Sequence, residues 1–205
     1  MIKSIYENQS ELLRGLLSLH CNDNIVADIT YGNGGLYKDF GWEPSYRFDI
    51  DPQCEGIVKA CSTTLPIANE TFTSVMFDPP FLTYVKNARN HADGKHIMAS
   101  RFGGYYTYEE LKKHYQDTLD ECHRVLCRKG VLVFKCQDII HNHKMHCTHV
   151  NVIRWAEDRG FRLKDLFILV AKNRMPIPPT KTQTVPKKQK HARIFHSYFL
   201  VFEKL

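Results

Sequence analysis

The strongest chemical signal in this sequence is an apolar stretch that ends in an acid, two prolines and an aromatic residue. Residues 74–77 have the composition of a buried strand, and Asp78, Pro79, Pro80 and Phe81 follow directly. Asp78 and the Pro79 carbonyl offer two hydrogen-bond acceptors, which suit a planar amino group. The prolines fix the backbone, and Phe81 supplies a flat face on which a base can stack. Taken alone, these residues also fit a buried strand followed by a proline turn.

Two further apolar stretches carry an acid where a parallel sheet would bind a ligand. A short predicted strand contains Asp28 and leads into a turn with Thr30, Gly32 and Gly34. Glycine lets the backbone approach a ligand closely at the carboxyl edge of a sheet. Asp49 ends the next strand, where an acid can bind ribose hydroxyls. Each feature alone is compatible with a plain turn, but their spacing fits one β-α-β unit.

Alternating helical and strand patterns must position these residues. Strand patterns alternating with helical ones indicate an α/β fold with a mostly parallel sheet and right-handed crossovers. The final two strands have no helix between them and should pair as an antiparallel edge. Helices are predicted over residues 2–19, 108–127 and 149–159, and strands over 25–29, 46–50, 56–60, 74–77, 131–135, 166–171 and 194–202. We expect a single domain over residues 1–205.

Composition narrows the function classes. The chain has 205 residues, 43% of them hydrophobic, which is enough for a sizeable core. Its formal charge of +6 favours a polyanionic partner. Seven cysteines without disulfide spacing, and no signal peptide, indicate a reducing compartment, so a cytoplasmic location is expected. No apolar run approaches the roughly 20 residues of a membrane-spanning helix, so no membrane partner is expected.

Two polar stretches, residues 82–107 and 173–193, are candidate nucleic-acid-binding loops. The first is long enough to be a lid or binding loop, and the second contains no acidic residue. A basic loop beside an active edge can follow phosphates, although a solvated surface loop explains the same charges. The candidate contacts are Lys86, Arg89, Arg101, Lys187, Lys188, Lys190 and Arg193.

Residues 141–149 contain four histidines and one cysteine, a composition that raises the question of zinc. Their spacing matches no known zinc pattern. We therefore predict no metal site and a polar loop before a helix.

In their order along the chain, these motifs resemble the amino-methylating DNA methyltransferases. The likeness is carried by Asp28 with its glycine turn, by Asp49, and most specifically by Asp78-Pro79-Pro80-Phe81. It extends to residues 131–138 and to the closing strand at 196–204, and is greatest with the small single-domain members of phages and prophages. The resemblance implies a seven-stranded, Rossmann-like fold with an antiparallel C-terminal edge strand, in a bacterial or phage-infected cell.

The resemblance also implies the cofactor and the roles of the site residues. The cofactor would be S-adenosyl-L-methionine, with its methionine part lined by the turn after the first strand and its ribose held by Asp49. Asp78 and Pro79 would accept hydrogen bonds from the target amino group, and Phe81 would stack on the base. The family often has an acid near the cofactor adenine, where this chain has Cys61 and Ser62, so Ser62 would take its place.

An acid in the first position of the motif favours adenine N6 in DNA as the target. Cytosine N4, an RNA base, and an inactive nucleic-acid-binding protein of the same fold remain as alternatives. A dehydrogenase fits less well, because the glycine turn is incomplete and the Asp-Pro-Pro-Phe motif has no role in hydride transfer. The flanking sequence of the target, the oligomeric state and any restriction partner are not predicted.

Overall fold

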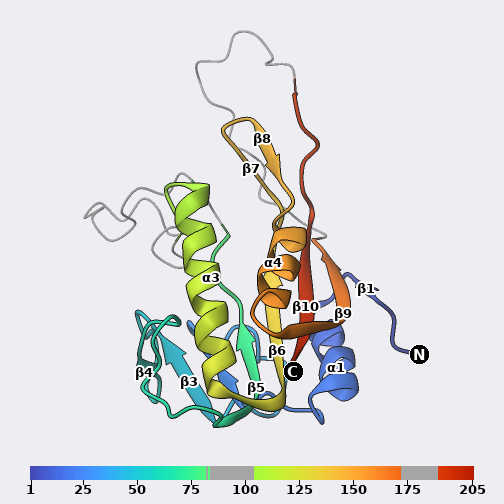
Figure 1. Cartoon of the computed structure of the whole chain (residues 1–205). Coiled ribbons are helices and arrows are strands. Elements are labelled where there is room, and N and C mark those ends of the chain that lie inside the picture. Colours follow the sequence, from blue (N-terminus) through green and yellow to red (C-terminus); the bar gives the residue numbers. More distant parts are fainter. Residues whose placement is uncertain (82, 84–103, 172–188) are drawn as a thin grey trace.

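The computed structural model describes residues 1–81, 83, 104–171 and 189–205. Within them, eight strands form one mixed sheet (Figure 1). All neighbouring pairs are parallel except the two that β10 makes. The spatial order is β1 (Ile5–Tyr6), β9 (Phe161–Val170), β10 (His196–Lys204), β6 (Leu126–Cys136), β5 (Phe72–Phe77), β2 (Ala27–Asp28), β3 (Tyr46–Asp49) and β4 (Val58–Lys59). The predicted α/β class is confirmed.

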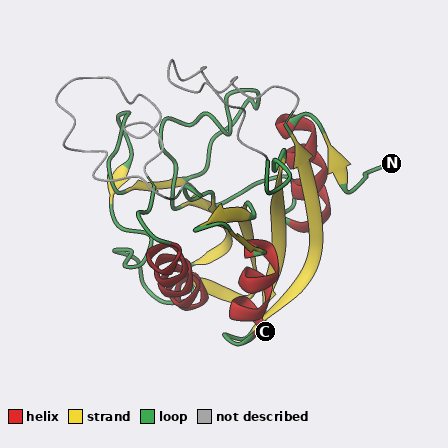
Figure 2. Ribbon diagram, turned by 90° about the horizontal axis from the view of Figure 1, so that it is seen from above, coloured by secondary structure: helices red, strands yellow, loops and turns green. Residues whose placement is uncertain are grey.

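Helices cover both faces of the sheet, as the view from above shows (Figure 2). Helix α1 (Gln9–His20) lies on one face, and α3 (Tyr108–Val125) and α4 (Thr148–Glu157) lie on the other. Successive strand residues point to opposite faces. On β6, Phe134 therefore packs with the α3 side, whereas Val133 packs with the α1 side. Within the described residues, no helix combines the length and the apolar character that crossing a membrane requires.

The C-terminal strand is antiparallel, as predicted, but it lies inside the sheet. Strand β10 pairs with β9 on one side and with β6 on the other. The crossover from β6 through α4 to β9 passes over one strand position, and β10 fills it from the opposite direction. The outer edge is instead β1, an eighth strand of two residues that pairs parallel with β9.

Most element boundaries differ from the sequence prediction by a few residues, and the largest differences are at the first helix, at β6 and at β9, which begins at Phe161 rather than at residue 166. The first helix begins only at Gln9, because the Asn8 side chain caps it by accepting a hydrogen bond from the Glu11 amide at 3.0 Å. The strand predicted over residues 131–135 is longer than expected. Helix α3 ends at Val125 and β6 starts at once, so Gly130 lies inside a strand rather than separating a helix from one.

The histidine-rich stretch is a β-hairpin and not the predicted polar loop. Strands β7 (Ile139–His141) and β8 (Lys144–His146) pair antiparallel and project beyond the main sheet (Figure 1). Their two-residue turn, Asn142 and His143, has φ angles of 48° and 59°. Positive φ at both positions is typical of a type I′ turn, and the asparagine in the first position is its only clear sequence signal.

Candidate active site

Three carboxylates follow the ends of three neighbouring parallel strands. Asp28 ends β2, Asp49 ends β3 and Asp78 follows β5. Strand β2 pairs with both of the others, so the three residues share the carboxyl edge of the sheet. The structure thus brings together the three acids that the sequence places at strand ends, at the edge where open α/β sheets bind ligands.

The turn after β2 is joined to all three acids by hydrogen bonds. Its Thr30 amide donates to the Asp28 carboxylate at 2.8 Å, and the Thr30 hydroxyl accepts from the Asp78 amide at 2.8 Å. The Gly32 amide donates to the Asp49 carboxylate at 2.7 Å. These side chains satisfy backbone groups that no strand partner reaches, so the turn is held in one conformation.

The two predicted glycines of this turn have different roles. Both have positive φ, 61° for Gly32 and 71° for Gly34. A Cβ at Gly34 would lie 2.5 Å from the hydroxyl oxygen of Tyr31, so close packing requires glycine there. A Cβ at Gly32 would meet no atom within 4 Å, so Gly32 faces open space beside Asp49.

Asp28 is buried and carries a perturbed acidity. It is 1% exposed and accepts a 2.8 Å hydrogen bond from the Tyr37 hydroxyl. Burial raises the pKa of Asp28 to about 7, against hydrogen bonds from Thr30 and Tyr37 that lower it, and the nearby charges of Asp78 and Asp49 raise it further. A buried acid between two other acids stabilises a positively charged ligand in its neighbourhood.

Aromatic side chains of β5, β6 and α3 hold the Asp-Pro-Pro-Phe motif in place. Phe77, the last residue of β5, makes an edge contact with Phe134, with ring centroids 4.8 Å apart. The buried Tyr115 of α3 donates a hydrogen bond to the Pro80 carbonyl at 3.1 Å. Pro79 is buried and Phe81 is partly exposed. The motif therefore leaves β5 in a defined direction, with its terminal aromatic side chain accessible.

A lysine that the sequence analysis did not single out completes this edge. The Lys135 ammonium lies 2.8 Å from Asp78 Oδ2 and also donates to the Gln9 side-chain oxygen at 3.2 Å. Lys135 is only 12% exposed and Asp78 23%. The available signal was a charged residue in the apolar run of β6, where a buried charge needs a partner.

Ser62 is placed less favourably for the cofactor role that the resemblance implies. It is 5% exposed, and its hydroxyl lies 2.8 Å from His114 Nε2 and 3.1 Å from the Thr118 hydroxyl. Burial lowers the pKa of His114, which favours its neutral form. These contacts join the loop after β4 to helix α3.

The nucleic-acid candidates are only partly within the described residues. Lys190 and Arg193 are exposed on the segment that precedes β10. The remaining candidates, Lys86, Arg89, Arg101, Lys187 and Lys188, lie outside the described residues, as do most of the loops 82–107 and 173–193.

The histidines of 141–149 do not converge on a common point. Among the described residues, no three histidine, cysteine, aspartate or glutamate side chains are grouped so that they could hold a metal ion. His149 instead places its Nδ1 2.7 Å from Asp138, and His146 stacks on Tyr108 with ring centroids 3.8 Å apart. Their contacts are those of a packed hairpin base.

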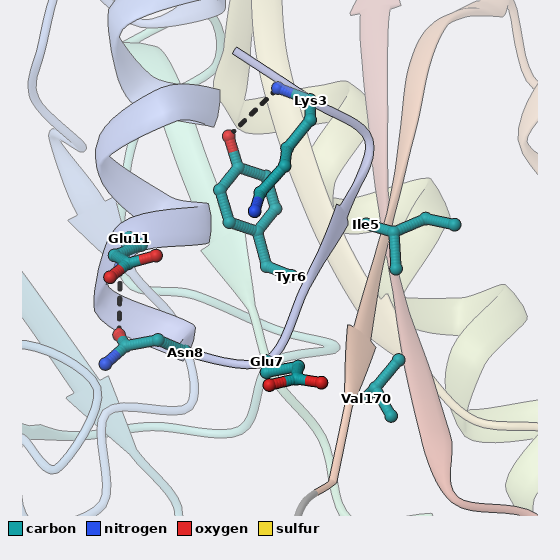
Figure 3. Close-up of a pocket in the computed structure, with 7 residues that line it drawn as sticks. All are labelled: Lys3, Ile5, Tyr6, Glu7, Asn8, Glu11 and Val170. Carbon is teal, nitrogen blue, oxygen red and sulfur yellow. Dashed lines mark hydrogen bonds between the residues drawn. The ribbon is translucent and has the colours of Figure 1, made fainter. Parts of the chain in front are cut away.

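A cavity of about 370 Å³ opens between β1 and the start of α1 (Figure 3). Inside it, the Lys3 amide donates to the Tyr6 hydroxyl, and Asn8 caps the helix through Glu11. In the sheet, β1 is four positions from β5. The cavity is lined by Lys3, Ile5, Tyr6, Glu7, Asn8, Glu11 and Val170, so it contains none of the predicted site residues.

No protein-family model and no curated protein sequence matches this chain, but solved structures do. A protein from Galdieria sulphuraria assigned as a sarcosine dimethylglycine methyltransferase is 13% identical over 95% of this chain and 84% of that one, with a TM-score of 0.54. The N-methyltransferase NodS from Bradyrhizobium japonicum WM9 is 11% identical over 96% of both chains, with a TM-score of 0.52. The chain has the class I, Rossmann-like methyltransferase fold.

A further similarity is to a protein from Thermus thermophilus, assigned as a DNA modification methylase and solved with S-adenosyl-L-methionine. The identity is 17%, the TM-score 0.43, and the match covers 68% of this chain and 50% of that one. This chain therefore spans about half the length of that protein.

Proposed function

We propose that this protein transfers a methyl group from S-adenosyl-L-methionine to the exocyclic amino group of a base in DNA, with adenine N6 as the favoured target. The observation that carries the proposal is the place of Asp78. It follows the central strand β5, and its backbone amide is bonded to the turn that joins Asp28 to Asp49. A group able to bind an amino nitrogen thus adjoins a group of residues suited to the cofactor.

The residues at this edge fit the cofactor chemically. S-adenosyl-L-methionine supplies a methyl group that its sulfonium already activates. The charge of Asp78 is paired with Lys135, but Asp49 and the ionised form of Asp28 place negative charge around the turn, which favours a ligand with sulfonium and ammonium charges. The turn residues Thr30, Gly32 and Gly34 would line the methionine part, and Asp49 would hold the ribose, with Gly32 leaving open space beside it.

Asp78 and the Pro79 carbonyl would prepare the target nitrogen for attack. The amino lone pair of adenine is delocalised into the ring, so the nitrogen is a poor nucleophile. Two acceptors on its hydrogens localise that lone pair. As the new nitrogen–carbon bond forms, the bond from the methyl carbon to sulfur breaks and the amino group loses one proton, which Asp78 can accept. Positioning of the two reactants supplies much of the remaining rate.

Phe81 would hold a base that has left the duplex. The amino group cannot be reached inside stacked DNA, and extruding a base costs a few kcal/mol. Stacking on an aromatic side chain returns roughly 1–3 kcal/mol. The partial exposure of Phe81 at the end of the rigid motif is compatible with this role.

Transfer from labelled S-adenosyl-L-methionine to duplex DNA, single-stranded DNA and RNA, followed by nucleoside mass spectrometry, tests the proposal. N6-methyladenine in DNA is the expected product. Asp78→Ala should lower the rate by about 10²- to 10⁴-fold, the usual range for a group that handles the proton. Asp117→Ala is the matched control, because Asp117 is a partly exposed aspartate of α3 that forms an ion pair with Lys113 on the surface.

Each other outcome has a definite meaning. N4-methylcytosine, or label only in RNA, would retain the site and replace the substrate. Full activity in Asp78→Ala would refute the assigned role of Asp78. Cofactor binding with no transfer to any nucleic acid would contradict the proposed substrate. If the protein does not bind the cofactor, only its fold is shared with the methyltransferases.

A further inference from the structure

The β7–β8 hairpin projects at the carboxyl edge of the sheet. Register pairs join Ile139 to His146 and His141 to Lys144, and the type I′ turn between them matches the twist of the two strands. In Figure 1 the hairpin extends beyond the end of β6, on the side of the sheet edge that carries Asp78. A two-stranded element of this kind is unusual outside a sheet and needs support at its base.

That support comes from three other elements. On α3, Tyr108 stacks on His146, and its hydroxyl accepts a 2.8 Å hydrogen bond from the Asn151 amide of α4. Asp138, which precedes β7, accepts hydrogen bonds from the His149 amide at 3.2 Å and from the Tyr198 hydroxyl of β10 at 3.3 Å. The base is therefore anchored, and the tip is carried at a fixed place relative to the site.

The hairpin is close to the proposed catalytic residue along the chain. Lys135, which contacts Asp78, precedes β7 by four residues. Extended backbone spans about 3.3 Å per residue, so the base of the hairpin lies within about 13 Å of the Lys135 backbone. The hairpin therefore begins close to Asp78, the residue proposed to bind the target amino group.

A second segment joins the hairpin tip. The His191 ring nitrogen Nε2 lies 2.9 Å from the His143 carbonyl oxygen, so the segment 189–195 meets the turn at His191. Neither this segment nor residues 139–149 contain an acidic residue. We call six exposed residues of these segments the hairpin surface: Asn142, His143, Lys144, Met145, Lys190 and Arg193.

The cations of this surface differ from several cations at helix α3, which are paired with acids. Lys113, Arg124 and Arg159 each form an ion pair with an acid of helix α3. Within the described residues, Lys144, Lys190 and Arg193 form none. Positive charges without neighbouring acids, beside a site for a base, are complementary to phosphates.

We infer that the hairpin surface holds duplex DNA next to the base that is being modified, with the β7–β8 tip in the major groove. The major groove is about 12 Å wide and admits a two-stranded β-ribbon. Lys144, Lys190 and Arg193 contact phosphates on its two sides, and His143 at the turn faces base edges. This inference rests on the proposed function, because it assigns the groove contact for the same DNA substrate.

Charge reversal with a matched control tests the phosphate contacts. Lys144→Glu and Arg193→Glu are compared with Arg128→Glu, an exposed arginine at the opposite, amino-terminal part of β6. Affinity for a fluorescent duplex is measured by anisotropy over a range of salt concentrations, with S-adenosyl-L-homocysteine present. Each hairpin variant should bind about tenfold more weakly than Arg128→Glu, with a salt slope lower by about 1.

The tip is tested by a substitution that keeps the turn. His143→Gly creates an Asn-Gly pair, the preferred sequence of a type I′ turn, so the hairpin should fold as before. We expect the preference among duplexes of different sequence to be reduced, while the salt slope is unchanged, because a base contact is lost and phosphate contacts remain. An unchanged preference would overturn the assignment of the tip to the groove.

Failure of this inference is distinguishable from failure of the proposed function. If wild-type protein methylates DNA and the hairpin variants bind like Arg128→Glu, the hairpin surface is wrong and the function stands. If the variants weaken only single-stranded DNA or RNA binding, the duplex assignment is wrong. If wild-type protein transfers no methyl group to any nucleic acid, the function fails, and the anisotropy series still decides whether this surface binds DNA.

Discussion

On one side of β5, strands β2, β3 and β4 contain two, four and two residues, whereas on the other side β6, β10 and β9 contain eleven, nine and ten. In the short-strand half, carboxylates hold the backbone of the turns. In the long-strand half, buried apolar side chains fill both faces of continuous strands. The proposed ligand-binding residues and the longest continuous strands thus lie in different parts of one sheet.

The difference between the two halves follows from how many residues of each strand form backbone hydrogen bonds with neighbouring strands. A long strand satisfies its amides with its neighbours and leaves no group for a ligand. After a short strand, the backbone amides of the following turn have no neighbouring strand to bond to. They then need side-chain acceptors such as Asp28 and Asp49. Those acceptors are costly to bury but place charge where a ligand binds. If this comparison is right, substitutions in the long-strand half should change stability without changing cofactor affinity, and substitutions in the short-strand half should change cofactor binding.

The largest expected effect is on stability, in the long-strand half. Leu200 of β10 is fully buried against the α3 and α4 side of the sheet. Leu200→Ala should lower the free energy of unfolding by about 2–5 kcal/mol, since it removes buried methyl groups and leaves a cavity. Urea unfolding measures the loss. Calorimetry at a temperature where the protein is folded should show unchanged affinity for S-adenosyl-L-methionine.

Leu19→Ala is the control, because it makes the same chemical change at a residue of α1 that is 52% exposed. It should alter stability by a few tenths of a kcal/mol at most, in the usual range for surface substitutions. A cofactor affinity that falls in Leu200→Ala while the protein is still folded would show that the two halves are not independent.

The next effect is a pH dependence that belongs to the short-strand half. Burial raises the pKa of Asp28 to about 7, so its carboxyl is protonated in the free protein below that pH. A cationic cofactor favours the ionised form, and binding must then expel the proton. Affinity for S-adenosyl-L-methionine should fall by up to about tenfold per pH unit between pH 7 and 5, and level off above pH 7.

Asp28→Asn should flatten this profile, because the amide has no proton to lose in that range. Calorimetry at pH 5, 6, 7 and 8 measures it, with Asp23→Asn as the control at an exposed aspartate whose φ of 65° suits asparagine. If cofactor affinity changes equally with pH in wild type and in Asp28→Asn, another group controls the pH dependence of cofactor binding. The ionised Asp28 would then not explain the preference for a cationic cofactor.

The sequence predicted that three acids share one sheet edge in the short-strand half better than it predicted the exact elements there. An acid after a short apolar run is visible in one dimension, and parallel pairing brings such acids to a single edge. Strands of two residues have almost no periodicity, which is why only the general positions of β2 and β4 were predicted. Ser62 illustrates the limit, since its partners His114 and Thr118 are more than 50 residues away.

In the long-strand half the reverse holds. The apolar runs predicted β6, β9 and β10, and the absence of a helix before β10 predicted its antiparallel pairing. The place of β10 between β6 and β9 could not be predicted, because local sequence does not encode which strands a crossover passes. The β7–β8 hairpin was missed because histidines at the pairing positions do not resemble ordinary strand residues.

Lys135 joins the two halves, and its substitution should have the smallest of the three effects. It belongs to the long strand β6, yet its ammonium contacts Asp78 at 2.8 Å and Gln9 at 3.2 Å. We expect it to hold the Asp78 carboxylate in one orientation. Lys135→Met should reduce kcat by about 10- to 100-fold, since a hydrogen bond to a charged group contributes about 1.5–3 kcal/mol, and leave cofactor affinity unchanged. Lys135→Arg should restore part of the rate. The control is Lys164→Met, at a lysine of β9 that pairs with Glu203, and it should leave kcat and cofactor affinity unchanged. Steady-state kinetics gives kcat, and calorimetry on the same samples gives the cofactor affinity. A fall in cofactor affinity as large as the fall in kcat would mean that Lys135 supports the turn after β2 rather than the proposed catalytic role of Asp78.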